Sequence, residues 1–247
     1  MSRSPAARVT LAASAALVLV AGAPPAAPAA QDARPAVVQS RVIGHSVKDR
    51  PIRAWRVGDP DARTRAVALA SLHGDEAAPR MILQQIRDGR PVEGIDLWVV
   101  PVVNPDGFLA DRRHNARGVD LNRNFPREWV RTATSGRRPA SEPETRALMR
   151  FLDRVDPRFV VSFHQPLYGI DTYGPKKRWF GRRLSEELNL PRKDFACGSG
   201  CHGTLTQWFN NRFDGVAVTV EYGADPSWRR MNVVAPRQLL RALGGSR

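Results

Sequence analysis

Two residues able to bind a metal ion, His73 and Glu76, follow a continuous apolar stretch at 66–72. Side chains three residues apart lie on the same side of a helical turn, so this imidazole and this carboxylate can converge on one ion. A catalytic zinc site needs three protein ligands and one open position for water, and two histidines with one glutamate form such a set. Because His-x-x-Glu occurs by chance in many proteins, the spacing alone is a weak signal.

A third ligand must come from another part of the chain, and His164 directly follows the apolar stretch 159–163. A single histidine at the end of a strand is more often structural than metal-binding. Of the five histidines, however, His164 is the one besides His73 that stands at the end of a predicted strand. The others fall in a strand-turn or in loops: His45, His114 and His202. His164 is therefore the candidate third ligand.

A glutamate, Glu221, ends the apolar run 216–221. A strand of this composition is expected to be buried, and burying a carboxylate is costly unless a charge or a metal ion compensates. A surface glutamate fits this pattern poorly. Glu221 is therefore a candidate functional residue.

Strand-like and helix-like segments alternate from residue 37 onward. Continuous apolar runs predict buried strands, and apolar residues at helical spacing predict helices. This alternation implies an α/β sandwich with a largely parallel or mixed sheet, in which ligand groups gather at strand ends. The predicted strands are 37–43, 52–57, 66–72, 95–103, 159–163 and 216–221, and the predicted helices are 77–87, 141–153, 177–188 and 236–243.

The segment between the second buried strand and the helix at 141–153 carries several polar signals. The run Asn-Pro-Asp-Gly at 104–107 is typical of a turn. A long loop to about residue 140 follows, and loops of this length are usually functional. Ser141 as N-cap and Glu144 three residues later predict a capping box. We interpret Glu142 and Glu144 as residues that begin the helix.

Six motifs follow one another along the chain: His73-x-x-Glu76, Asn-Pro-Asp-Gly at 104–107, Gly-Val-Asp-Leu-Asn-Arg-Asn-Phe at 118–125, Ser-Glu-Pro-Glu-Thr at 141–145, Phe163-His164 and Val220-Glu221. In this order they resemble the zinc carboxypeptidase family, over about residues 37–240. Within that family the run Asp-Leu-Asn-Arg-Asn-Phe-Pro at 120–126 and the segment 164–167 are more similar to murein peptide amidases and γ-D-glutamyl-diaminopimelate peptidases than to digestive carboxypeptidases.

The resemblance implies a single-domain α/β/α sandwich with a mixed central sheet and one Zn²⁺ per chain. The metal would be held by His73, Glu76 and His164, and zinc chemistry would activate water and polarise the scissile carbonyl. Glu221 would act as the general base.

The resemblance also implies roles for residues of the loop between 108 and 140. Arg113 would stabilise the oxyanion, with the adjacent Arg112 as the alternative. Asn122 and Arg123 would bind a free carboxylate of the substrate, and arginine suits this role because its planar guanidinium binds a carboxylate bidentately.

One segment departs from the pattern of the family. Digestive carboxypeptidases carry a tyrosine on a mobile loop ahead of the catalytic glutamate, whereas the corresponding residues here, 197–204, contain no tyrosine. A role for a closing tyrosine is therefore in doubt, and the departure favours the amidase-like subgroup.

The first thirty residues have the layout of a secretory signal peptide, with Arg3 and Arg8, an apolar stretch at 9–21 and small residues behind it. The apolar stretch is shorter than the roughly 20 residues that span a bilayer, although an uncleaved anchor is the alternative. We expect residues 1–30 to be a signal peptide and 31–247 to be one catalytic domain. The protein would then be secreted and act in the cell envelope.

The net charge and the cysteine content constrain the function less than the motifs do. The net charge of +14 suggests polyanionic surroundings, which for an exported protein are an anionic cell-wall surface and not nucleic acid. Cys197 and Cys201 stand in a Gly-rich loop, and a local disulfide is expected in an oxidising compartment. A second metal site with His202 is the alternative. We expect a monomer.

These features together predict an exported zinc peptidase that cleaves an amide bond beside a free carboxylate. The expected bond joins γ-D-glutamate to diaminopimelate in peptidoglycan stem peptides. The alternatives are an ordinary metallocarboxypeptidase acting on extracellular peptides, a deacylase of related fold, and an inactive cell-wall binding module.

Overall fold

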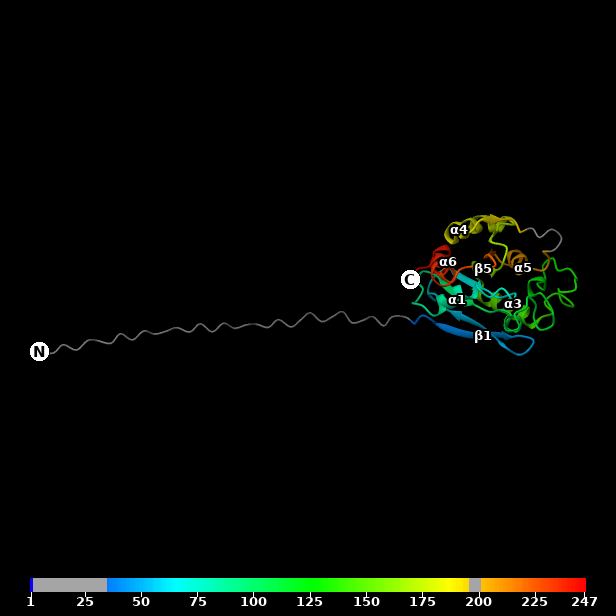
Figure 1. Cartoon of the computed structure of the whole chain (residues 1–247), viewed down its shortest axis with the longest axis horizontal. Helices are drawn as coiled ribbons and strands as arrows, with labels where there is room; N and C mark the ends of the chain where they lie inside the picture. Colours follow the sequence, from blue (N-terminus) through cyan, green and yellow to red (C-terminus); the bar gives the residue numbers. More distant parts are fainter. Residues whose placement is uncertain (2–34, 196–200) are drawn as a thin grey trace. The chain divides into compact units, whose positions relative to one another are not determined.

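Within the described residues, eight strands form one mixed sheet in the order β1-β2-β4-β3-β5-β8-β6-β7 (Figure 1). The inner strands β4, β3, β5 and β8 are parallel to one another, while β2 and β6 run antiparallel to their inner neighbours. The expected mixed sheet is confirmed. The strands are β1 (Gln39–His45), β2 (Pro51–Arg56), β3 (Arg65–Leu69), β4 (Asp96–Val100), β5 (Phe159–His164), β6 (Gly169–Asp171), β7 (Arg192–Lys193) and β8 (Val216–Glu221).

Helices cover both faces of the sheet, so the inner strands are apolar on both sides. On β3, Ala66 and Ala68 face one core with α1, α4 and α6, whereas Val67 and Leu69 face a second core with α3 and α5. The α-helices are α1 (Arg80–Arg87), α2 (Pro105–Leu109), α3 (Pro143–Val155), α4 (Arg178–Leu188), α5 (Leu205–Arg212) and α6 (Ala235–Leu243). Short 3₁₀ turns η1 (Leu121–Arg123) and η2 (Pro175–Lys177) and a π-helix η3 (Arg230–Val234) complete the fold.

Two local predictions are wrong. The segment at 104–107 is no simple turn but the start of α2, because the Asn104 side chain caps it by accepting from the Gly107 N–H at 2.9 Å. Helix α3 begins at Pro143 with no side-chain cap. The predicted capping box is absent here because Ser141 Oγ instead contacts Asn124 and Glu142. Glu144 is fully buried and accepts from the Val47 N–H.

The structure is a computed structural model, and it describes residues 1, 35–195 and 201–247. The expected signal peptide and the expected Cys197–Cys201 disulfide therefore involve residues outside the described ones. Among the helices in the described ranges, none has the length and apolar character needed to cross a bilayer.

Candidate metal centre and active site

The carboxyl ends of parallel strands bring distant residues to one edge of the sheet. On β5 and β8 the last residues, His164 and Glu221, are direct register partners. The chain leaves β3 at the same edge and bends through Ser71, whose φ of 48° is left-handed. Gly74 lies so close to the backbone of Gly107 that a Cβ there would be 2.0 Å from its carbonyl carbon. A glycine is therefore required inside the metal-binding turn.

The three candidate ligands meet in one buried cluster, and we call His73, Glu76 and His164 the metal cluster. Glu76 Oε1 lies 2.7 Å from His73 Nδ1, Glu76 Oε2 lies 2.7 Å from His164 Nδ1, and the two Nδ1 atoms are 3.3 Å apart. The three potential ligand atoms lie within 4.8 Å of one another. Two imidazole nitrogens and one carboxylate at this spacing fit a zinc ion.

His73 and Glu76 converge through a tight turn and not through a helix. The Glu76 N–H donates to the His73 carbonyl at 3.3 Å, and α1 begins only at Arg80. The expected helical turn is therefore wrong, although the expected convergence of the two side chains is correct.

Each histidine is oriented by a partner on its other ring nitrogen. His73 Nε2 lies 3.0 Å from Asp120 Oδ1, and His164 Nε2 lies 2.9 Å from Ser162 Oγ. Such partners fix the tautomer, so that both rings present Nδ1 to the ion. Asp120 lies inside a family motif of the sequence, but its position there does not by itself indicate a role. The acidic residue in that motif is the signal that could have indicated a partner for a metal-binding histidine.

The charges of the cluster are strongly coupled. Burial alone lowers the pKa of His73, but hydrogen bonds to Asp120 and Glu76 raise the pKa to about 9. Burial alone raises the pKa of Glu76, but His164 and His73 lower the pKa to about 2. Zinc binding therefore competes with protonation of His73, because a ligand imidazole must be neutral.

Glu221 lies beside the metal cluster and is 8% exposed. Burial and the nearby negative charge of Glu76 raise the pKa of the Glu221 carboxyl, against the opposing effect of His164. One of its oxygens accepts from the Leu167 N–H at 3.2 Å. A glutamate with a raised pKa next to a metal site is suited to accept a proton.

Gln165 connects the segments that carry these groups. Its Oε1 accepts from the Ala78 N–H at 3.1 Å, just beyond the metal-binding turn. Its Nε2 donates to the carbonyls of Gly223 and Ala224, at 2.9 and 3.0 Å, just beyond Glu221. One amide thus joins the ends of three segments around the site.

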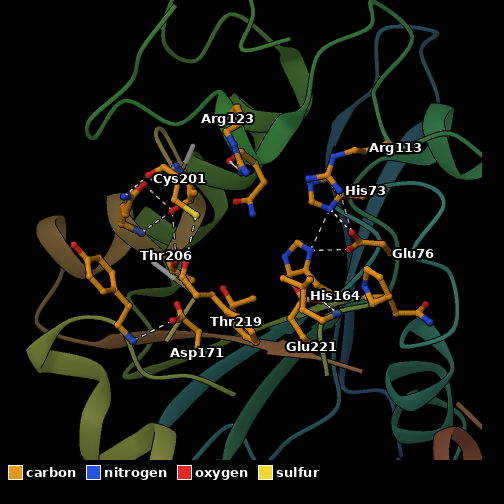
Figure 2. A pocket seen from close by; sticks show the side chains of 18 of the residues that line it. His73, Glu76, Arg113, Arg123, His164, Asp171, Cys201, Thr206, Thr219 and Glu221 are labelled. Atoms are coloured by element: carbon orange, nitrogen blue, oxygen red, sulfur yellow. Dashed lines mark hydrogen bonds and ion pairs between the residues drawn. The ribbon is translucent and has the colours of Figure 1, made fainter. Parts of the chain in front are cut away.

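A cavity of about 300 Å³ opens in front of the metal cluster. Figure 2 shows the metal cluster and Glu221 on one side of the opening, Asp171, Thr206 and Cys201 on the other, and Arg123 between the two. Arg112 does not line this cavity within the described residues, whereas Arg113 does. The lining also includes these polar side chains: Asn122, Arg123, Gln165, Asp171, Tyr173, Lys177, Thr204, Thr206, Gln207 and Thr219.

The loop residues are held by hydrogen bonds close to the cluster. Arg113 lies 3.0 Å from Asp120 and 3.3 Å from Glu76. Asp120 also accepts from the Asn122 N–H at 2.9 Å, and Asn122 Oδ1 accepts from the Leu205 N–H at 3.0 Å. The four predicted site residues other than the metal ligands all line the same cavity: Glu221, Arg113, Asn122 and Arg123.

A buried pair of histidines and a glutamate at the carboxyl edge of a mixed α/β sheet, with a second glutamate beside them, is the arrangement of a zinc-dependent hydrolase. The chain belongs to the zinc carboxypeptidase family, whose model matches residues 27–167. It is 34% identical to murein peptide amidase A of Escherichia coli K12 over 165 residues, which cover 60% of this chain and 67% of the relative. The enzyme of the same name from Vibrio campbellii is 31% identical over 188 residues, 68% of this chain and 73% of the relative.

Solved structures agree with this assignment. The murein-tripeptide amidase from Escherichia coli O157 superposes with a TM-score of 0.69 at 29% identity, covering 83% of this chain and 91% of that one. The carboxypeptidase A from Helicoverpa armigera gives a TM-score of 0.66 at 20% identity, covering 85% and 66%. The second likeness concerns the fold alone.

Proposed function

We propose that this zinc peptidase hydrolyses the amide bond between γ-D-glutamate and diaminopimelate in peptidoglycan stem peptides. The observation that carries the proposal is the position of Arg123 and Asn122 on the same cavity as the metal cluster. An arginine there can bind a carboxylate beside the scissile bond. The similarity to murein peptide amidase A supports this choice of bond.

The groups around the cavity can divide the reaction between them. A bound zinc ion supplies Lewis acidity, which lowers the pKa of water and polarises a carbonyl. Glu221 accepts the proton of the attacking water and passes it to the leaving amine, for which its raised pKa is suited. Arg113, 39% exposed at its side chain, can donate to the oxyanion from the mouth of the cavity.

Recognition of the leaving side follows from the arrangement of η1. Arg123 Nη1 donates to the Asn122 carbonyl at 2.9 Å, which holds the guanidinium beside its neighbour. Because Asn122 Oδ1 is already an acceptor for Leu205 N–H, its NH₂ group is the end that can donate to a substrate carboxylate. Together the two side chains can bind the carboxylate on the carbon that bears the leaving amine.

We further propose export to the cell envelope, which rests on the N-terminal sequence and not on the described structure. Arg3, Arg8 and the apolar stretch 9–21 support it. N-terminal sequencing of the protein purified from the culture medium or envelope tests this. A mature chain that starts near residue 30 is expected, and an intact Met1 contradicts it.

An ordinary metallocarboxypeptidase is the second candidate, favoured by membership of the zinc carboxypeptidase family. The two candidates differ in the bond that is cut. A synthetic γ-D-glutamyl-diaminopimelate peptide and an α-linked dipeptide are digested in parallel, and the products are identified by mass. We expect faster cleavage of the γ-linked peptide, with Glu221→Gln as the control for contaminating peptidases. Preference for the α-linked peptide would establish the second candidate.

A further inference from the structure

A buried ion pair lies on the side of the cavity opposite the metal cluster. Lys177 Nζ is 2.6 Å from Asp171 Oδ2, and the two side chains are 6% and 9% exposed. Lys177 Nζ also lies 3.5 Å from Thr206 Oγ1, and Asp171 Oδ1 accepts from the Tyr173 N–H at 3.0 Å. We call Asp171, Lys177 and Thr206 the far wall, and all three line the cavity (Figure 2).

The mechanism does not use this pair, and stability alone does not explain it. Removing two charges from water costs several kcal/mol per ion, and well-packed apolar residues are often as stabilising as a buried pair. Asp171 ends β6 and Lys177 ends η2, so the pair could tie these short segments together. A structural tie, however, would not need both charges to line the substrate cavity.

The pair offers both signs of charge within one small patch. An apolar side chain entering the cavity would bury both charges without new partners. A side chain with a single charge would meet one attractive and one repulsive group. A side chain that ends in an ammonium and a carboxylate matches both, with the ammonium donating to Asp171 and the carboxylate accepting from Lys177.

We infer that the far wall is a subsite for a zwitterionic side chain on the leaving residue. The inference rests on the proposed function, because diaminopimelate is an amino acid whose side chain ends in a second ammonium and carboxylate. When the substrate binds, Asp171 contacts the far ammonium and Lys177 contacts the far carboxylate, in place of part of their contact with each other. Arg123 binds the carboxylate next to the scissile bond. Selectivity for diaminopimelate then comes from two separate carboxylate-binding points in one cavity.

The test compares three leaving residues that differ at the far end alone. Diaminopimelate has both charged groups, lysine lacks the far carboxylate, and 2-aminopimelate lacks the far ammonium. Each is joined to the same acyl group in both γ- and α-linkage. The wild type should cleave the diaminopimelate peptides with a kcat/KM at least about 30-fold above the other two, the effect of losing one buried charge-assisted contact.

The variants should change the preference and not merely the rate. Lys177→Met should abolish the preference for diaminopimelate over lysine, because the remaining Asp171 carboxylate favours an ammonium. Asp171→Asn should abolish the preference over 2-aminopimelate. The exposed neighbour Lys176, whose Nζ contacts the Phe213 carbonyl, gives the matched control Lys176→Met, which should keep the wild-type preference.

Several results would overturn the inference. Equal losses on all three leaving residues would mean that the pair merely holds β6 and η2 together. A wild type that does not distinguish the leaving residues would refute the inference even if a variant fails to fold. The double variant Lys177→Met with Asp171→Asn leaves no unpaired charge, and it should show no preference for diaminopimelate.

Failure of the proposed function is separable from failure of the subsite. If γ-linked peptides are not cut, the choice of bond is wrong, while the α-linked series still measures the far-end preference. Calorimetry with free diaminopimelate and free lysine gives the same comparison without turnover. Tighter binding of diaminopimelate to the wild type, lost in Lys177→Met, supports the subsite, and equal binding contradicts it.

Discussion

The two sides of the cavity are built from different kinds of structure. The metal cluster and Glu221 lie at the ends of the long inner strands or in the turn after β3, and every member is buried. The far wall comes from the three-residue strand β6, the single turn η2 and the first turn of α5. Chemistry is thus placed on the rigid sheet and selectivity on short segments, which tolerate change more easily.

Loss of a metal ligand should have the largest effect of any single change. His164→Ala removes one of three protein ligands, so the variant should lose both bound zinc and all measurable turnover. Zinc content by atomic absorption and the initial rate are measured on the same sample. His45→Ala, at the exposed end of β1, is the matched control. Unchanged zinc stoichiometry in the His164 variant would refute the ligand assignment.

Loss of Glu221, the proposed general base, should separate turnover from metal binding. Glu221→Gln should retain zinc and lower kcat by about 10²–10⁴-fold, the usual contribution of a general base. A near-normal rate would require another base.

The pH profile sharpens this prediction. Glu221 must be ionised to accept a proton, and its pKa is raised. In the wild type, kcat/KM should therefore fall as pH drops through a value above that of an ordinary glutamate. The residual activity of Glu221→Gln should lack this acidic limb. If the limb persists in the variant, another group is responsible for it.

Arg123, which we propose binds the substrate carboxylate, lies between the two sides of the cavity (Figure 2), and the effect of its loss should depend on the substrate. Arg123→Ala should lower kcat/KM by roughly 30- to several-thousand-fold for a substrate with a free carboxylate, the cost of about 2–5 kcal/mol for one charged contact. The matching amide should lose much less. Arg123→Lys should restore only part of the loss, because an ammonium lacks the bidentate geometry.

The control for this prediction is Arg127→Ala, since Arg127 pairs with Glu128 at the surface. It should leave both substrates unaffected. Equal losses on acid and amide in Arg123→Ala would show that Arg123 supports the loop and does not bind the substrate.

Loss of an orienting partner should have the smallest effect on the metal side. Asp120→Asn keeps the shape but removes the charge that holds His73, so zinc affinity should fall by about 10–100-fold. Competition with a chromogenic chelator measures the affinity. Asp153→Asn, which alters a surface pair with Arg212, should leave it unchanged. Unaltered affinity in Asp120→Asn would mean that packing alone orients the ring.

The metal side could be predicted from the sequence because its signals are local. The strand 216–221 was predicted with the bounds of β8, and a carboxylate at the end of an apolar run is unusual enough to identify Glu221. His164 follows the same logic at the end of β5. Family motifs then added Arg113, Asn122 and Arg123, which the structure places on the cavity.

The far wall could not be predicted because its signal arises from packing. The sequence predicts Lys177 at the start of a helix, where a lysine is usually solvated, yet its ammonium is buried against Asp171, six residues earlier in the chain. Nothing in either local sequence distinguishes the pair from surface charges. Helix α5 was also missed, although Thr204 and Gln207 form a capping box at its start. Its amphipathic pattern is short, and the Gly-rich segment before it obscured the boundary.

The three hydrogen bonds of Gln165 determine when the segments around the site lose conformational entropy. Because one amide joins the chain beyond Glu76, the chain beyond His164 and the chain beyond Glu221, these segments lose their relative freedom when the protein folds. These segments are therefore already ordered before a peptide binds, so little binding free energy is needed to order them. On binding, mainly the substrate loses conformational freedom. A site arranged in this way can therefore act on small peptides that make few contacts with the protein.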